Sequence, residues 1–136
     1  MAKGVCHKHL FPTMKKIFTF ILLSMIAFNA IHAEITWDLS DDGTLTISGT
    51  DMPDYRWGTY PWYSQRGKIK EIVIEDGVTS IGAYAFYNCQ NIVSVTIPNS
   101  VSSIGYRAFS GCSGLTSITI PNSVSSIGRE TFYDCI

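Results

Sequence analysis

The body of this 136-residue chain lacks histidine, because His7, His9 and His32 all lie within the first 33 residues. A Ser-His-Asp triad, a Cys-His nucleophile pair and a histidine-based zinc site each need that side chain. Carboxylate pairs at a repeated spacing, another common arrangement for acid-base chemistry, are also missing. We therefore expect a protein that is not an enzyme, with no catalytic residue, no metal site and no cofactor.

Positive charge is scarce outside the N-terminal segment. Residues 1–33 contain four lysines and no carboxylate, whereas residues 34–136 contain all 11 Asp and Glu residues but only six of the ten Lys and Arg residues. The body is therefore acidic, whereas the binding of nucleic-acid phosphates requires a basic patch. This composition argues against nucleic acid as a partner.

No apolar run reaches the ~20 residues that a membrane-spanning helix needs. The longest run, residues 17–28, follows Met14-Lys15-Lys16. A cationic start before a short apolar stretch is typical of a secretory signal peptide. We expect residues 1–33 to form a leader that is cleaved after Ala33, with Met14 as the true start; the alternative is a buried hydrophobic helix. The mature chain would then be secreted or displayed at the cell surface, without a transmembrane span.

Self-similarity with a period of 23 residues dominates the second half of the chain. The units are 69–91, 92–114 and 115–136, the last of which is one residue short. Within them, Ile97–Gly105 recurs unchanged as Ile120–Gly128. A single unit of this size cannot bury its own apolar side chains, so such units stack into a solenoid. No polar capping unit follows, and we expect a truncated array.

Each unit is predicted to contribute one short strand. Apolar residues alternate with a strand period around Ile72 and Ile74, and at the equivalent positions of the other units. The outward positions of these strands form the candidate ligand-binding face: Glu71, Val73, Ser94, Thr96, Ser117 and Thr119.

The rest of each unit predicts a second inward rung, a bend and turns. The rung comprises Val78/Ile81, Val101/Ile104 and Val124/Ile127, each followed by a glycine that frees the backbone for a sharp bend. One aromatic ring per unit is expected to stack in the interior: Phe86, Phe109 and Phe132. Two columns favour turns because their residue types tolerate positive φ, namely Asn88/Gly111/Asp134 and Asn91/Gly114.

Cys89, Cys112 and Cys135 share one column of the repeat. Three thiols in line cannot all pair, and metal sites usually show closer Cys or His spacing. We favour a ladder of buried thiols that act as small apolar side chains. A disulfide between neighbouring units remains the alternative, since export permits oxidation.

These columns resemble the BspA-like, or treponemal-type, leucine-rich repeat. Its pattern Ile-Pro-x-x-Val-x-x-Ile-Gly-x-x-Ala-Phe-x-x-Cys is met at every fixed position by Ile97–Cys112. Ile120–Cys135 departs from it at Thr131 and Ile74–Cys89 at Glu75. The resemblance implies a β-rich α/β fold, a right-handed leucine-rich-repeat solenoid. It also implies a bacterial surface protein that mediates adhesion or protein binding to host components.

Residues 34–68 are predicted to form an N-terminal β-hairpin and an aromatic cap. Ile35–Leu39 and Thr44–Ser48 are separated by Ser40-Asp41-Asp42-Gly43, and Asp-Gly between strand-like runs is a strong hairpin signal. This segment also resembles the region that precedes such repeats. Calcium binding by the Asp pair is a weaker alternative, because the fuller Asp-x-Asp-x-Asp-Gly loop is absent.

Five aromatic residues lie within Tyr55–Tyr63. We favour a cap over the first repeat, with Trp62 and Tyr63 buried, since solenoids need covered ends. The alternative is an exposed ligand patch, for which Tyr55 and Trp57 are the candidates.

Two functions compete on the sequence alone. One is a binding module whose partner is a protein, or alternatively a glycan, on host or neighbouring cells. The other is a structural spacer or a fragment of a longer array. The pairs Ser94/Thr96 and Ser117/Thr119 are identical and small, which favours the spacer, because hot spots are rich in Trp, Tyr and Arg.

Overall fold

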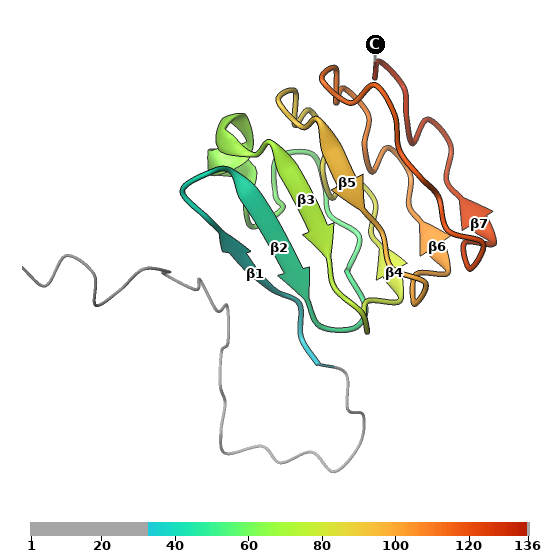
Figure 1. The fold of residues 1–136 in the computed structure, drawn as a ribbon. Helices are drawn as coiled ribbons and strands as arrows, with labels where there is room; N and C mark the ends of the chain where they lie inside the picture. Colours follow the sequence, from blue (N-terminus) through green and yellow to red (C-terminus); the bar gives the residue numbers. More distant parts are fainter. Residues whose placement is uncertain (1–32, 136) are drawn as a thin grey trace, which may run out of the picture.

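The computed structural model describes residues 33–135 as a structure of two sheets. The predicted leader, apart from Ala33, and Ile136 lie outside the described residues. The larger sheet has the order β1 (Thr36–Leu39), β2 (Thr44–Ser48), β3 (Glu71–Ile74) and β5 (Ser94–Thr96). The smaller one consists of β4 (Ser80–Ile81), β6 (Ser103–Ile104) and β7 (Ser126–Ile127), and the strands of both sheets lie in successive steps across the molecule (Figure 1).

Helical structure is minor in the described part of the chain. Its one helix is the 3₁₀ helix η1 (Tyr63–Lys68). No helix within residues 33–135 has the length and apolar character needed to cross a bilayer.

Between the repeats, parallel pairing joins residues that are 23 positions apart. Glu71 pairs with Ser94 on β3 and β5, and Ser103 of β6 pairs with Ser80 on one side and Ser126 on the other. Main-chain bonds continue this spacing outside the strands, as from Val93 N–H to the Lys70 carbonyl over 2.8 Å. The period seen in the sequence is therefore the register of the parallel ladders.

The second inward rung forms a sheet of its own, which the sequence interpretation missed. Val78 and Ile81 are buried as predicted, but Ile81 also belongs to β4 and pairs with Ile104 of β6. Gly105 N–H donates to the Ile81 carbonyl over 2.7 Å and Gly128 N–H to the Ile104 carbonyl over 2.8 Å. Strands of two residues are too short to show the alternation that predicts a strand.

The predicted hairpin is present, and its second strand pairs with the strand of the first repeat. β1 and β2 pair antiparallel, with Trp37 opposite Ile47. β2 then pairs in parallel with β3, and Asp51 forms a bridge with Ser80. Residues 44–68 thus lie alongside the first repeat as an earlier turn, with Leu45, Ile47 and Met52 in the core.

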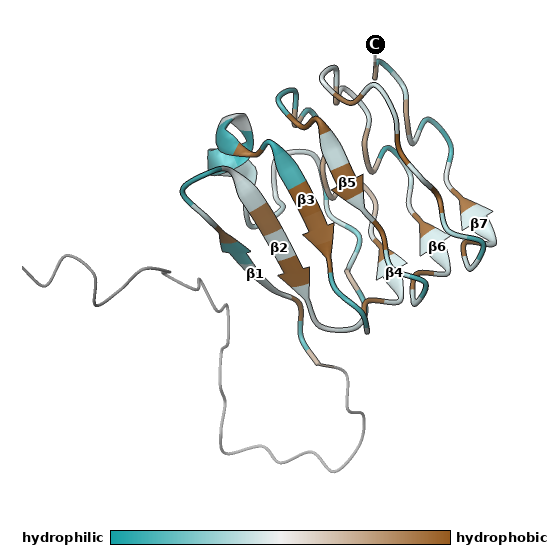
Figure 2. Cartoon of the chain, in the orientation of Figure 1, coloured by the Kyte–Doolittle hydropathy of each residue, from teal (hydrophilic) through white to brown (hydrophobic). Residues whose placement is uncertain are grey.

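Apolar side chains from the lead-in and from all three repeats pack in one core. Figure 2 shows apolar positions on parts of β2, β3 and β5, and hydrophilic ones on β1, η1 and several connecting turns. Phe86 and Phe109 stack with ring centroids 5.2 Å apart, and Phe109 and Phe132 with centroids 5.8 Å apart. The predicted aromatic stack is therefore present and runs across the repeats.

The third repeat departs from the expectation of one strand per unit, because no strand is assigned at Ser117–Thr119. Among the described residues, the third repeat has a neighbouring repeat on one side only. Its backbone at residues 117–119 can therefore form ladder hydrogen bonds on that side only. Ile127 is 49% exposed and Phe132 is only partly buried, although their equivalents Ile104 and Phe109 are fully buried.

Two glycine columns have a role that the sequence interpretation did not predict, because they allow neighbouring turns to approach closely. Positive φ does occur at Asn88, Gly111 and Asp134, as expected for turns. At Gly105, by contrast, φ is not positive, and an added Cβ would lie 2.5 Å from the Ala83 nitrogen on the neighbouring turn. Gly114 likewise lacks positive φ, and its Cβ would lie 2.7 Å from the Gln90 carbonyl oxygen. Asn91 and Gly114 do lie in turns, as predicted, and at Gly105 and Gly114 the missing side chain also permits close stacking of neighbouring turns.

Candidate functional site

The outward face of the larger sheet carries mostly hydroxyl groups. Burial alternates along β3, so that Ile72 and Ile74 point inward while Glu71 and Val73 face outward. The register places Ser94 beside Glu71 and Thr96 beside Val73. The structure thus brings four of the six predicted face residues together. Ser117 and Thr119 are exposed but lie outside the pairing.

β1 and β2 extend this face, which the sequence interpretation missed. One row crosses all four strands through Asp38, Thr46, Val73 and Thr96. The in-out alternation of Thr44–Ser48 matches that of β3 and could have revealed β2. A search at a fixed period does not find it, because Thr44 pairs with Glu71, 27 residues later. We call the outward residues of β1, β2, β3 and β5 the strand face.

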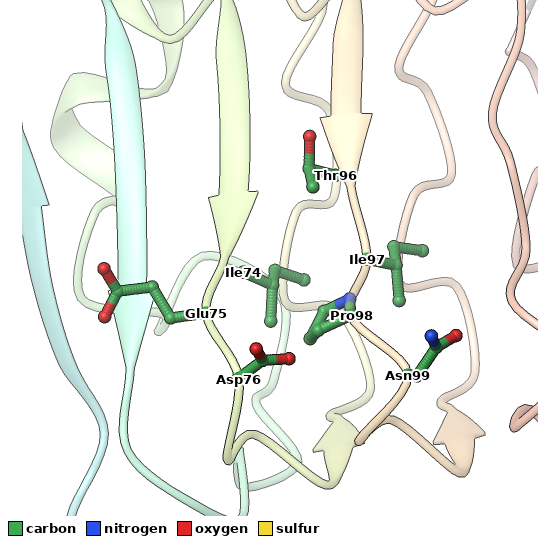
Figure 3. A pocket seen from close by; sticks show the side chains of 7 residues that line it. All are labelled: Ile74, Glu75, Asp76, Thr96, Ile97, Pro98 and Asn99. Carbon is green, nitrogen blue, oxygen red and sulfur yellow. The ribbon is translucent and has the colours of Figure 1, made fainter.

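A groove of about 640 Å³ opens where β3 and β5 end. Figure 3 shows Ile74, Ile97 and Pro98 around it, with Asp76 and Asn99 toward the turns that follow. The Glu75 side chain points toward β2, where its carboxylate accepts a hydrogen bond from the Ser48 hydroxyl. The groove adjoins the strand face through Thr96 and combines apolar walls with acidic and amide groups.

Trp62 extends the interior stack of rings by one turn. It is fully buried, and its ring stacks on Phe86 with centroids 5.5 Å apart. Its indole N–H donates to the Ala85 carbonyl over 2.9 Å. The lead-in therefore covers the first repeat with a ring that takes the place of a repeat phenylalanine.

Tyr60 is another buried ring of the lead-in, beside Trp37 and Trp62, and the sequence interpretation did not select it. Its hydroxyl donates to the Tyr87 carbonyl over 2.6 Å, and burial raises its pKa above the usual value for tyrosine. Tyr63, which was expected to be buried, is only half-buried, and Arg66 lies over its ring at 4.1 Å.

The two ligand candidates of the lead-in, Tyr55 and Trp57, have different surroundings. Tyr55 is half-buried and packs edge-on against Trp62, with centroids 5.8 Å apart. Burial raises the pKa of Tyr55 to about 12. Trp57 is 64% exposed at a turn closed by the Thr59 N–H to Arg56 carbonyl bond. Tyr55 thus packs against the core cluster, whereas the Trp57 side chain is exposed.

The three repeat cysteines form the expected column of thiols, none of them in a disulfide. Cys112 donates its S–H to the Phe86 carbonyl and Cys135 to the Phe109 carbonyl, each over 3.1 Å. Burial raises the pKa of Cys89 to about 12 and also raises the pKa of Cys112. Cys112 and Cys135 are thus bonded to main-chain carbonyls, while Cys89 contacts the Tyr60 hydroxyl over 3.9 Å; Cys135, unlike the other two, is only partly buried. These surroundings favour a structural role for the three thiols.

Hydrogen bonds within the hairpin turn account for Asp42 without calcium. Asp42 accepts hydrogen bonds from the Ser40 hydroxyl and from Thr44 N–H, and the Ser40 bond is the main cause of its lowered pKa. Asp41 and Asp42 line a cavity of about 410 Å³ together with Lys68 and Lys70. The positive charges of the two lysines disfavour a cation there. Residues 33–135 contain no group of three or more His, Cys, Asp or Glu side chains placed to hold a metal ion.

Comparisons with known proteins agree with this geometry. A family model described as a BspA type leucine rich repeat region of six copies matches residues 58–136. A solved leucine-rich repeat protein from Eubacterium ventriosum is 35% identical over 77% of this chain, with a TM-score of 0.66. One from Bacteroides ovatus is 31% identical over 79% of this chain, with a TM-score of 0.53.

The matched regions are only part of each relative. The chain spans 34% of the Eubacterium protein and 33% of the Bacteroides protein, about a third of each. No protein with a curated description matches the chain.

Proposed function

Because the chain belongs to the BspA-type leucine-rich repeat family, we propose that it is an exported protein-binding module that acts at the cell surface. In this proposal the chain adheres to a protein on host or neighbouring cells and catalyses no reaction on that protein. The proposal includes cleavage after Ala33, a lead-in at residues 34–68 and three repeats at 69–91, 92–114 and 115–136. It also includes a right-handed solenoid built from these units.

The main support for this proposal is the continuity of the strand face. This face is a continuous surface from β1 to β5, and within residues 33–135 Figure 1 shows no other helix or strand in front of it. Concave or flat repeat faces of this kind are common recognition surfaces. The addition of β1 and β2 widens the face beyond the repeat strands, toward the roughly 800 Å² per partner of a standard interface.

The structural spacer remains the second candidate, and one observation favours it. Apart from Asp38, Glu71 and Val73, the outward side chains of the strand face are hydroxyls. Small hydroxyl side chains are rarely hot spots, which favour Trp, Tyr and Arg.

Binding of the full chain to a panel of purified extracellular-matrix proteins, measured by biolayer interferometry, tests the two candidates. The variants Thr46→Arg and Thr96→Arg place bulky cations in the middle of the strand face, whereas Ser64→Arg on η1 is the matched control. We expect binding to at least one protein, weakened about tenfold or more by each face variant and unchanged by the control. Absence of binding to every protein would favour the spacer, whereas equal binding by all variants would show that the bound protein does not contact the strand face.

Export is tested separately by expression of the full gene in a bacterial host. We expect a secreted or surface-bound product whose N-terminal peptide begins at Glu34, as read by mass spectrometry. An intact leader on a product that stays in the cytoplasm would contradict this part of the proposal.

A further inference from the structure

A second groove lies away from the strand face, where the turns after each phenylalanine lie side by side. It has a volume of about 350 Å³, within the usual range for small-ligand pockets, ~300–1,000 Å³. All three repeats contribute to it. Main-chain bonds tie these turns together: Asn88 N–H donates to the Ser110 carbonyl and Gly111 N–H to the Tyr133 carbonyl, each over 2.8 Å. The groove is therefore built on hydrogen-bonded backbone.

The side chains of one column give the groove its shape. Tyr87, Ser110 and Tyr133 occupy equivalent positions, so the middle repeat has a small residue where both neighbours have a ring. Ser110 is buried, and Gly111 and Ser113 beside it are also small. Neighbouring turns in a parallel ladder are ~4.8 Å apart, which separates the two tyrosine positions by roughly 10 Å. The result is a gap flanked by two rings over a small floor.

The polar groups that line the groove are mostly neutral. Gln90 donates its amide N–H to the Asn88 side-chain oxygen over 3.2 Å, which leaves the Asn88 amide N–H groups and the Gln90 oxygen as further donors and acceptors. Arg107 also lines the groove, but its charge is matched by Glu130, which accepts from its Nε over 2.6 Å. Asp134 adds one exposed carboxylate. The groove therefore has no strong excess of positive charge.

We propose that this groove binds a neutral sugar ring, seated between Tyr87 and Tyr133. The apolar C–H face of a pyranose packs on an aromatic ring, and its hydroxyls match amide donors and acceptors. An extended peptide would need an open strand edge for its main-chain bonds, and these turns instead bond to one another. The matched charge of Arg107 disfavours an acidic ligand. This site is separate from the strand face and does not depend on the proposed protein partner.

Saturation-transfer NMR with the full chain tests the assignment. The probes are the methyl glycosides of glucose, galactose, mannose and N-acetylglucosamine, with sialyllactose and a proline-rich decapeptide as alternatives of other chemistry. We expect transfer to at least one neutral sugar. Titration of that sugar should show affinity about tenfold lower for Tyr133→Ala and for Tyr87→Ala, and little changed for Tyr133→Phe.

The control is Trp57→Ala, which removes an exposed ring outside the groove and should leave sugar affinity unchanged. Tyr133 is 58% exposed, so its truncation should preserve the fold, and a circular dichroism melt checks this. The proposal is overturned if no neutral sugar shows transfer, if Tyr133→Ala binds as well as the unchanged chain, or if only sialyllactose or the peptide binds. Matrix-protein binding measured on Tyr133→Ala separates this site from the strand face, since we expect that binding to persist.

Discussion

At the scale of single residues, glycines set how closely the turns approach. A Cβ at Gly128 would lie 2.5 Å from the Tyr106 nitrogen, which repeats the geometry at Gly105 one unit earlier. Both contacts are with backbone that is fixed by the neighbouring ladder, so no flexible side chain can move aside. Gly67, by contrast, has no atom within 4 Å of the added Cβ.

Replacement of Gly105 by alanine should therefore destabilise the chain. We expect the free energy of unfolding to fall by about 1–3 kcal/mol or more, the usual cost of forcing an atom into a packed interior. Gly67→Ala should be neutral or stabilising by up to about 1 kcal/mol, because it restricts the unfolded chain. Urea unfolding followed by circular dichroism measures both. Equal stability of the two variants would show that the turns are not in close contact at Gly105.

The buried thiols should make stability depend on alkaline pH. An unfolded cysteine ionises with a pKa of about 8.5, whereas burial raises the pKa of Cys89 to about 12. Between these values the unfolded state has lost the proton and the folded state has kept it. The contribution is therefore complete below pH ~8.5 and is lost as the pH rises toward 12.

For Cys89 alone this loss should be about 1–1.5 kcal/mol between pH 7.5 and 9.5. We expect urea unfolding at the two pH values to show a smaller decrease for Cys89→Ala than for the unchanged chain. Cys135→Ala is the control, because Cys135 is only partly buried and should change the decrease less. An identical pH dependence in all three proteins would mean that Cys89 is accessible to water in the folded state.

At the scale of elements, the lead-in does more than cover the first repeat. Its hairpin places β2 in parallel register with β3, and its Trp62 continues the column of phenylalanines. The lead-in thus supplies a strand, an interior ring and part of the strand face. A segment that only covered the end would not need to match the repeat in all three respects.

Trp62 and Trp57 provide a matched pair for this element. Trp62→Ala removes a fully buried ring and its bond to the Ala85 carbonyl, and should cost about 3–5 kcal/mol. Trp57→Ala removes a ring that is 64% exposed, and its effect should stay within about 0.5 kcal/mol. Thermal melts of both variants are the measurement. A small effect of Trp62→Ala would show that the lead-in is not packed on the first repeat.

The elements also show which features a sequence can predict. The hairpin, the stacked phenylalanines and the turn at Asn88 follow from local rules of periodicity and turn chemistry, and all three are present. The pairing of β2 with β3 was missed because it depends on two segments separated by an irregular loop. β4 was missed because two residues are too few to show a period, and Tyr60 because only tertiary contacts select it among five neighbouring aromatics.

At the scale of the whole molecule, the lead-in and the repeats share one interior and one sheet. The core cluster includes residues from both, from Trp37 in β1 to Leu115 in the third repeat. The strand face is therefore a property of the assembled molecule, because Asp38 and Thr46 come from the lead-in while Val73 and Thr96 come from the repeats. If either part unfolded alone, the proposed binding surface would be lost.

The positions of the tryptophan and cysteine residues allow a direct test of whether the lead-in and the repeats unfold together. All three tryptophans, Trp37, Trp57 and Trp62, lie in the lead-in, and none lies in the repeats. Their fluorescence therefore reports on residues 34–68. Cys112 is buried in the second repeat, so its alkylation reports on the repeats.

The measurement is urea unfolding of the full chain, with tryptophan fluorescence and pulsed alkylation of Cys112, read by peptide mass spectrometry, recorded on the same samples. A single cooperative unit gives coincident transitions, and we predict the same midpoint for both probes. A tryptophan transition at clearly lower urea, with Cys112 still protected, would contradict the account, because the lead-in would then be a separate cap and the continuous strand face would not exist as one folded surface.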